Sequence, residues 1–137
     1  MLVCSYMNKK ELRELNKIFD NHQDLKLVYL FGSRATGKAN EASDYDFAIF
    51  LDSRDAKKNY NIKFALMDEL GRFYKTDKID VIILDTLDKP ELKYNIIQEG
   101  ILILEKEPFK VLVEPRILNE YFDFHAMLVR NGLTKSL

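Results

Sequence analysis

Two apolar runs joined by a small-residue turn and a polar loop constrain this chain more than any other feature. The first run, at residues 27–31, stops at Gly32 and Ser33, and the second begins directly after Asp44 and Asp46. Because successive side chains of a strand alternate between faces, Asp44 and Asp46 are predicted to project together, with Cα atoms about 6.6 Å apart. The pattern therefore predicts a strand, a turn that can accommodate a phosphate, paired carboxylates and a second strand.

Hydrophobic periodicity predicts regular elements along nearly the whole chain. Helices are expected at about residues 8–21, 56–74, 90–99 and from Pro115 to 130, with Gly100 as a stop signal. Strands are expected at residues 25–31, 43–51, 78–84 and 101–104. The loop at residues 32–41 is expected to contain a short helical turn near Arg34. This succession indicates an α/β (α+β) fold.

Composition indicates one ordinary globular domain. The 137 residues are 47% hydrophobic and 31% charged, enough for a core without cross-links. We expect a single domain over residues 1–130, in which the helix at 115–130 is a candidate partner-binding element, followed by a tail at 131–137. The chain has no apolar run near the roughly 18 residues needed to cross a bilayer, so no membrane association is predicted.

Charge and cysteine content exclude further classes. The net charge of -1 provides no broad basic surface, so direct nucleic-acid binding is not expected. The single Cys4 excludes an intrachain disulfide, and with only two histidines it does not form a convincing zinc site. A cytoplasmic location fits this composition best.

A third acid, Asp80, interrupts the apolar strand predicted at residues 78–84. Three carboxylates packed together repel one another unless a cation lies between them. Ligand sets made only of oxygen favour Mg²⁺ or Mn²⁺, and two such ions can clamp the attacking and leaving oxygens of an in-line phosphoryl displacement. Asp44, Asp46 and Asp80 are therefore the candidate metal ligands and catalytic residues.

Four residues near the turn are candidates for nucleotide binding. Gly32 and Ser33 end a buried strand, where a small side chain lets the backbone approach a phosphate and donate hydrogen bonds to it. Arg34 follows directly and can serve as a charge-assisted donor, and Ser43 can donate its hydroxyl. The ordinary alternatives are a simple Gly-Ser turn, an exposed loop arginine and a serine that caps the turn before Asp44.

The acids have ordinary explanations as well. Asp44 can cap a turn, and Asp46 can lie on a solvated strand edge. Asp80 can pair with Lys78 or Arg72. However, Gly-Ser followed after ten residues by Asp-x-Asp arises by chance in only a few chains per thousand, roughly, at average residue usage, so the joint pattern favours a functional site.

The spacing of Gly32-Ser33 and Asp44-Tyr45-Asp46 matches the Gly-Ser-x10-Asp-x-Asp signature of the polymerase beta-like nucleotidyltransferase superfamily. The chain resembles in particular the minimal nucleotidyltransferases (MNT proteins), which act as antitoxins in HEPN/MNT toxin–antitoxin pairs. The segments that carry this resemblance are residues 31–37, 43–49, 80–84, 97–102 and 121–124, so it covers nearly all of the chain. It implies a polymerase beta-like fold, a small mixed sheet flanked by helices.

The resemblance also implies roles for the candidate residues. Gly32 and Ser33 would hold the triphosphate, and Asp44 and Asp46 would bind the catalytic metals. Asp80 would share the metal that activates the acceptor hydroxyl and serve as its general base. The implied reaction is attack of a hydroxyl on the α-phosphate of a nucleoside triphosphate, with pyrophosphate leaving.

The acceptor is the least constrained part of the prediction. The resemblance implies an antitoxin that transfers AMP from ATP to a tyrosine of a HEPN-type RNase toxin. The helix expected from Pro115 has a wide apolar face, on which Leu118 and Phe122 lie beside the packing stripe and are candidate partner contacts. The alternatives are transfer to a small molecule or an RNA end, and a non-catalytic antitoxin that acts by binding only. A homo-oligomer is also compatible with the sequence.

Overall fold

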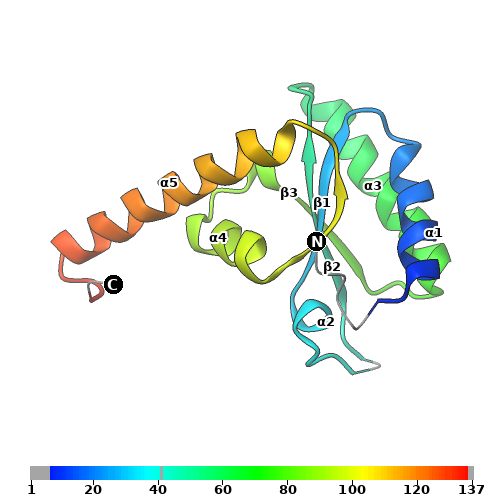
Figure 1. The fold of residues 1–137 in the computed structure, drawn as a ribbon, viewed down its shortest axis with the longest axis horizontal. Helices are drawn as coiled ribbons and strands as arrows, with labels where there is room; N and C mark the ends of the chain where they lie inside the picture. Colours follow the sequence, from blue (N-terminus) through cyan, green and yellow to red (C-terminus); the bar gives the residue numbers. More distant parts are fainter. Residues whose placement is uncertain (1–6, 41, 136–137) are drawn as a thin grey trace.

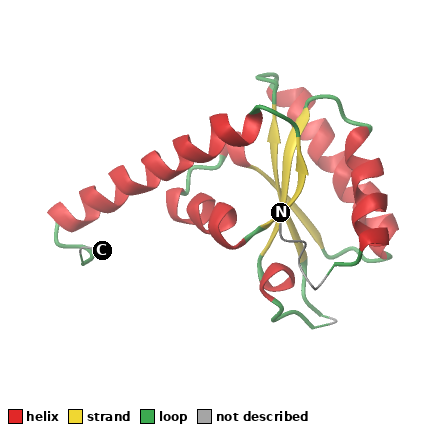
Figure 2. Cartoon of the chain, viewed as in Figure 1, coloured by secondary structure: helices red, strands yellow, loops and turns green. Residues whose placement is uncertain are grey.

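A computed structural model describes residues 7–40 and 42–135 of the chain. Cys4, the loop residue Glu41 and the last two residues of the predicted tail lie outside the described residues. The elements follow in the order α1 (Lys9–Asp20), β1 (Leu25–Phe31), α2 (Ser33–Thr36), β2 (Tyr45–Leu51), α3 (Ala56–Tyr74), β3 (Ile79–Ile83), the 3₁₀ helix η1 (Leu84–Thr86), α4 (Pro90–Glu99), β4 (Ile101–Glu105) and α5 (Phe109–Arg130). The predicted α/β class is confirmed (Figure 1 and Figure 2).

The four strands form one mixed sheet in the order β3-β2-β1-β4. Strand β1 is antiparallel to β2 and to β4, whereas β2 and β3 run parallel. Asp46 lies opposite Phe31 in one ladder and opposite Asp80 in the other. The carboxyl end of β1 and the amino ends of β2 and β3 therefore meet at one end of the sheet.

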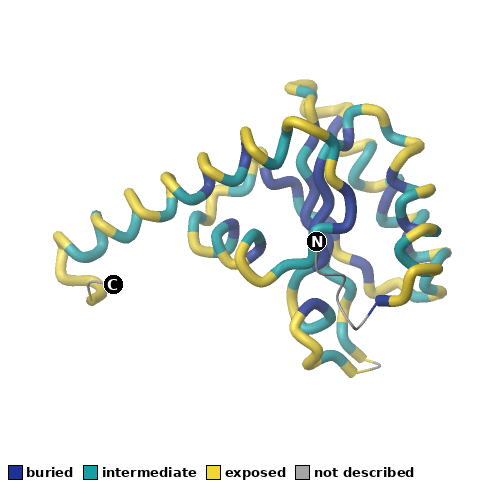
Figure 3. Tube along the Cα trace, viewed as in Figure 1, coloured by how far each residue is buried: buried dark blue, intermediate teal, exposed yellow. Residues whose placement is uncertain are grey.

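Helices cover both faces of the sheet (Figure 1 and Figure 3). Helices α1 and α3 pack on one face, where Phe19, Phe47 and Leu66 are fully buried. Helices α4 and α5 pack on the other face through Ile96 and Val113, which contact a cluster that also includes strand residues. Successive residues of β2 alternate between these two clusters. The face of the sheet to which each β2 side chain near the acids points is therefore known.

Local sequence signals explain several helix ends. The side chain of Asn8 accepts a hydrogen bond from the Glu11 amide at 2.7 Å, as the predicted cap of α1 requires. Asp55 caps α3 in the same way, and Pro90 opens α4. The stop at Gly100 is confirmed, and a residue with a Cβ does not fit there, because the Cβ would clash with the Ile96 carbonyl oxygen.

The prediction that the last helix begins at Pro115 is wrong. Helix α5 begins at Phe109 and contains Pro115 in its interior. Phe109 and Val113 pack against the sheet, and the Tyr29 hydroxyl donates to Glu114 at 2.5 Å, so tertiary contacts order the first two turns. The proline has no backbone N–H, so the carbonyl of Val111 loses its hydrogen bond within the helix. Val111 is 74% exposed, so water can bond to this carbonyl instead.

The far half of α5 extends beyond α4 and away from the sheet (Figure 1 and Figure 3). Ile117 is buried and Tyr121 stacks on Tyr94 of α4 with ring centroids 3.9 Å apart. Phe122 remains 47% exposed. Among the described residues, no helix combines the length and apolar character needed to span a bilayer.

Candidate active site

Gly32 connects β1 to the acidic end of the sheet. Its φ of 75° lies in the region that L-residues rarely adopt, and a Cβ at this position would lie 2.5 Å from Oδ2 of Asp46. Glycine is thus required here for two independent reasons, one conformational and one steric. The consequence is that the carboxylate of Asp46 lies directly against the Gly32-Ser33 turn.

Asp46 and Asp80 share a face of the sheet because they are opposite each other in the parallel ladder of β2 and β3. Their neighbours Phe47 and Val81 are buried under α1 and α3, so the two acids project on the side of α4 and α5. Asp46 is half-buried and Asp80 is exposed at this end of the sheet. The convergence predicted for these two acids is therefore present.

The ordinary explanation for Asp80, an ion pair with a nearby base, finds no support. Nζ of Lys78 donates instead to the carbonyl of Ala42 at 3.2 Å. Arg72 pairs with Asp68 at 2.9 Å, one turn earlier in α3. Within the described residues, both basic side chains are thus engaged elsewhere.

Asp44 precedes β2 instead of lying in it, which corrects the strand predicted from residue 43. The strand begins at Tyr45, whose amide donates to the carbonyl of Lys78 at 2.9 Å. Asp44 is exposed in the loop, so the strict alternation argument does not place its side chain. Its charge still acts on Asp46.

Asp44 and Asp80 both interact electrostatically with Asp46. Partial burial raises the pKa of Asp46, and the negative charges of Asp80 and Asp44 raise it further. Within residues 7–40 and 42–135, no group of three or more acidic, histidine or cysteine side chains is arranged so that it could hold a metal ion. The donors nevertheless fit a hard divalent cation, because they are all carboxylate oxygens and a cation would relieve their repulsion.

Arg34 and Ser43 hold the intervening loop. Nη2 of Arg34 donates to the carbonyls of Asn40 at 3.2 Å and Ser43 at 3.0 Å, and its guanidinium carbon lies 3.9 Å from the ring centroid of Tyr45. The Ser43 hydroxyl oxygen accepts from the Asn40 amide at 3.0 Å. Phosphate contacts by Gly32, Ser33, Arg34 and Ser43 stay predictions.

Two residues behind the site, Tyr74 and Glu11, are not predicted from the sequence. Tyr74 stacks on Tyr45 with ring centroids 3.9 Å apart, and its hydroxyl donates to Glu11 at 2.7 Å. Tyr45 itself packs against the core on the face opposite the acids, as its position in β2 predicts. Periodicity assigns Tyr74 and Glu11 to helices, but it does not indicate that the ends of α1 and α3 meet.

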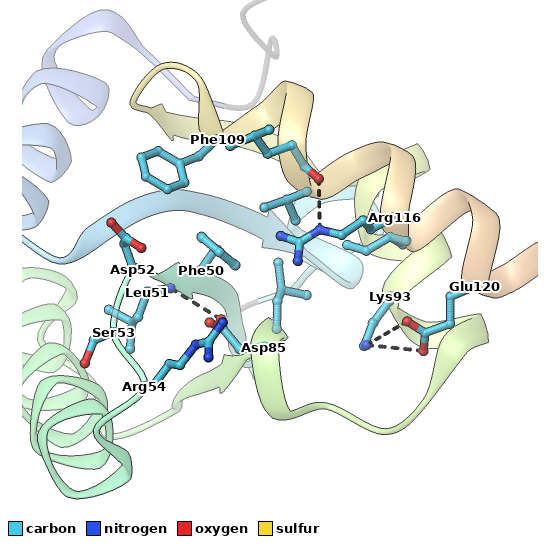
Figure 4. Close-up of a pocket in the computed structure, with 14 residues that line it drawn as sticks. Phe50, Leu51, Asp52, Ser53, Arg54, Asp85, Lys93, Phe109, Arg116 and Glu120 are labelled. Carbon is cyan, nitrogen blue, oxygen red and sulfur yellow. Dashed lines mark hydrogen bonds and ion pairs between the residues drawn. The ribbon is translucent and has the colours of Figure 1, made fainter.

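A cavity of about 450 Å³ lies at the end of the sheet opposite the acids (Figure 4). It is bounded by the end of β2, η1 and the first turns of α4 and α5. Lys93 is buried there and pairs with Glu120 at 3.2 Å, and Arg116 and Asp85 also line it. Basic and acidic side chains are balanced in this cavity, which distinguishes it from the purely acidic end of the sheet.

Comparison with known proteins places this geometry in a family. The family model described as "Polymerase beta, Nucleotidyltransferase" matches residues 13–109, more than half of the chain. A relative from Aphanizomenon flos-aquae, named protein adenylyltransferase MntA, is 40% identical over 88 residues, which are 58% of this chain. The matched region is 57% of that relative, so the chain spans little more than half of its length.

Solved structures share the fold. A crystal structure of a toxin-antitoxin with AMP-PNP has a TM-score of 0.71 at 20% identity and covers 90% of this chain and 98% of that chain. A structure of the MNT antitoxin in complex with the tri-AMPylated HEPN toxin of Shewanella oneidensis has a TM-score of 0.66 at 19% identity and covers 93% and 100%. The family match, the shared fold and the acids beside Gly32 agree: the chain belongs to the polymerase beta nucleotidyltransferase family.

Proposed function

We propose that this chain is a metal-dependent nucleotidyltransferase of the cytoplasm, an antitoxin that transfers AMP from ATP to a tyrosine of a cognate HEPN-family RNase toxin. The observation that carries the proposal is the in-register pairing of Asp46 and Asp80 against the Gly32 turn. Family membership supports nucleotidyl transfer. The name of the 40%-identical relative, a protein adenylyltransferase, supports AMP as the transferred group and a protein as the acceptor.

The acidic end of the sheet provides the groups that this reaction needs. Asp44, Asp46 and Asp80 would hold the divalent cations, which would supply charge neutralisation for the phosphoryl transfer. Gly32 lets the Asp46 carboxylate lie against the turn, and Ser33 would bind the triphosphate beside it. Positioning and charge neutralisation provide most of the acceleration.

Asp80 is suited to receive the acceptor's proton because it is exposed at the start of β3. The tyrosine oxygen attacks the α-phosphorus and forms the new phosphodiester bond, while the bond between the α- and β-phosphates breaks. The proton passes to Asp80 and then to solvent, and pyrophosphate leaves.

Solved structures of similar fold support ATP as the nucleotide, and they and the last helix support a protein partner. One matched structure contains AMP-PNP and another a tri-AMPylated HEPN toxin, according to their descriptions. In this chain, Phe122 is 47% exposed although its ring lies beside Tyr94 of α4, and Leu118 is half-buried on the same helix. Such a projecting apolar surface fits a protein partner.

The proposal is tested with the protein encoded beside this chain, which the proposal requires to be a HEPN-type toxin. The two proteins are incubated with Mg²⁺ and with ATP labelled at the α-phosphate, and label is expected on the partner. ATP labelled at the γ-phosphate must leave the partner unlabelled, because pyrophosphate departs. Asp46→Asn is expected to abolish labelling, whereas Asp68→Asn, an exposed acid paired with Arg72, serves as the matched control. An unlabelled partner in the wild-type reaction contradicts protein adenylylation.

Two alternatives give different results in the same experiment. Transfer to a small molecule or an RNA end predicts label in those fractions and not on the protein. A non-catalytic antitoxin predicts that the double variant Asp44→Asn with Asp46→Asn still neutralises the toxin in cells as well as wild type does. The adjacent, mutually repelling acids favour the enzyme, because simple binding gives no reason to keep them together.

A further inference from the structure

Arg34 lies on the side of β2 opposite the acids. Its guanidinium covers one face of the Tyr45 ring at 3.9 Å from the centroid, and Tyr74 stacks at the same centroid distance of 3.9 Å. Two groups this close to one ring must occupy its two opposite faces. Tyr45 is therefore enclosed between a cation and a second aromatic ring, an arrangement that attracts the cation to the ring face.

The same guanidinium closes the loop that precedes the acids. Its Nη2 atom donates to the carbonyls of Asn40 and Ser43 at 3.2 and 3.0 Å, so it joins α2 to the residue directly before Asp44. Its Nε is buried without an acceptor among the described residues, so these carbonyls and the stack hold the group. Lys78, directly before β3, holds the same loop through the carbonyl of Ala42.

The stack is anchored at its far end. The Tyr74 hydroxyl, at the end of α3, donates to Glu11 in the first turn of α1 at 2.7 Å. Burial and this hydrogen bond raise the pKa of Tyr74, so the phenol remains a neutral donor. Arg34 is thus connected through two rings to the helices behind the sheet.

We propose that Arg34 is a positioning residue: it fixes Asp44 and Asp46 by holding the carbonyls of the preceding loop while stacking on Tyr45. The inference rests on the proposed nucleotidyl transfer and adds a residue that acts through the acids. A planar guanidinium can donate through its edge and stack through its face at the same time. A lysine ammonium cannot do both, so charge alone does not replace Arg34.

Kinetics of the wild-type complex and its variants separate positioning from phosphate binding. Arg34→Lys and Arg34→Met are both expected to lower kcat for AMP transfer about 10- to 100-fold, the scale of misplacing a catalytic group by roughly 1 Å. The KM for ATP should change much less. Lys38→Met, an exposed cation in the same loop, is the matched control and should match wild type.

Tyr45 provides a second test that does not alter any cation. Tyr45→Leu removes the stack and is expected to reproduce the loss in kcat, whereas Tyr45→Phe keeps the ring and should retain the rate. Combining Arg34→Met with Tyr45→Leu should be no worse than the more severe single change, because both act through one contact. A near-normal rate for Arg34→Lys and for Tyr45→Leu, with a raised KM for ATP in Arg34→Met, would overturn the inference in favour of a phosphate contact.

Hydrogen–deuterium exchange provides a readout that needs no activity. Arg34→Met should increase exchange in residues 38–47 of the ATP-free protein and leave the centre of α3 unchanged. Unchanged exchange in residues 38–47 would overturn the inference. If wild type transfers no AMP, the proposed function fails, and the exchange data still decide whether Arg34 orders the loop that carries the acids.

Discussion

At the scale of single residues, the site depends on Asp46, whose ionised form is disfavoured by its surroundings in the folded protein. Asp46 is half-buried beside the Gly32 turn, which limits the space around its carboxylate. Burial and the negative charges of Asp80 and Asp44 raise its pKa. A group placed in this way reduces the stability of the metal-free protein. It therefore serves ligand binding at some cost to the fold.

Replacing Asp46 by Asn is expected to stabilise the metal-free protein near neutral pH. Because the folded-state pKa of Asp46 is raised, its stabilising contribution is present at low pH and is lost as the pH rises through that value. The gain in Tm should therefore shrink on acidification, when wild-type Asp46 also becomes neutral. Thermal unfolding in EDTA at several pH values measures this. A lower Tm for Asp46→Asn near neutral pH contradicts the assignment.

Gly32→Ala is expected to lower both stability and AMP transfer. An alanine Cβ would adopt a strained φ of 75° and meet Oδ2 of Asp46 at 2.5 Å. The strain alone costs about 1–3 kcal/mol in the free energy of unfolding. Gly132→Ala is the matched control, because its φ of 68° imposes similar strain with no atom within 4 Å of the new Cβ. Equal losses in the two variants, measured by urea unfolding, would argue against the close approach.

At the scale of elements, the sequence predicts those parts of the fold that local patterns determine. The strands at β1 and β4 and the stop at Gly100 follow from apolar runs bounded by turn residues. The start of α5 does not, because Phe109 and Val113 become helical through contacts with the sheet that outweigh the signal of Pro115. The displacement of Asp44 from β2 depends likewise on the pairing of Tyr45 with Lys78, a contact between distant segments.

Pro115→Ala should stabilise the chain, because it restores a hydrogen bond within α5. The gain in the free energy of unfolding is at most about 3 kcal/mol, the propensity difference between proline and alanine in a helix interior. Val111→Ala, at an exposed position on the same helix, is the control and should change stability little. Chemical denaturation measures both variants, and a destabilised Pro115→Ala would show that the proline is required for the path of α5.

At the scale of the whole molecule, the two ends of the sheet differ in character. The acids meet the Gly32 turn at one end, and the charge-balanced cavity around Lys93 and Asp85 lies at the other. The sequence predicts the first because Gly32 and Asp46 belong to one compact motif and Asp80 interrupts an otherwise apolar strand. It does not predict the second, or the stack from Arg34 to Glu11, because these bring together residues far apart in the chain.

Phe122, in the far half of α5, is expected to contribute more to partner binding than to the stability of the fold, because its ring is 47% exposed. Phe122→Ser should leave the Tm close to that of wild type and weaken binding of the HEPN-type partner about 10- to 100-fold, the range of an interface hot spot. Phe64→Ser, on α3 at 60% exposure, is the matched control for loss of an exposed ring. Titration calorimetry compares the two, and equal affinities would place the interface elsewhere.

The most direct measurement of the central claim is anomalous diffraction from crystals of this chain grown with Mn²⁺ and AMP-PNP. The account predicts manganese peaks bonded to the carboxylates of Asp46 and Asp80, at roughly 2.0–2.4 Å as oxygen ligands require, with the phosphates beside Gly32. Manganese and nucleotide bound at the opposite end of the sheet, or Asp46 and Asp80 without metal in crystals that contain the nucleotide, would contradict it.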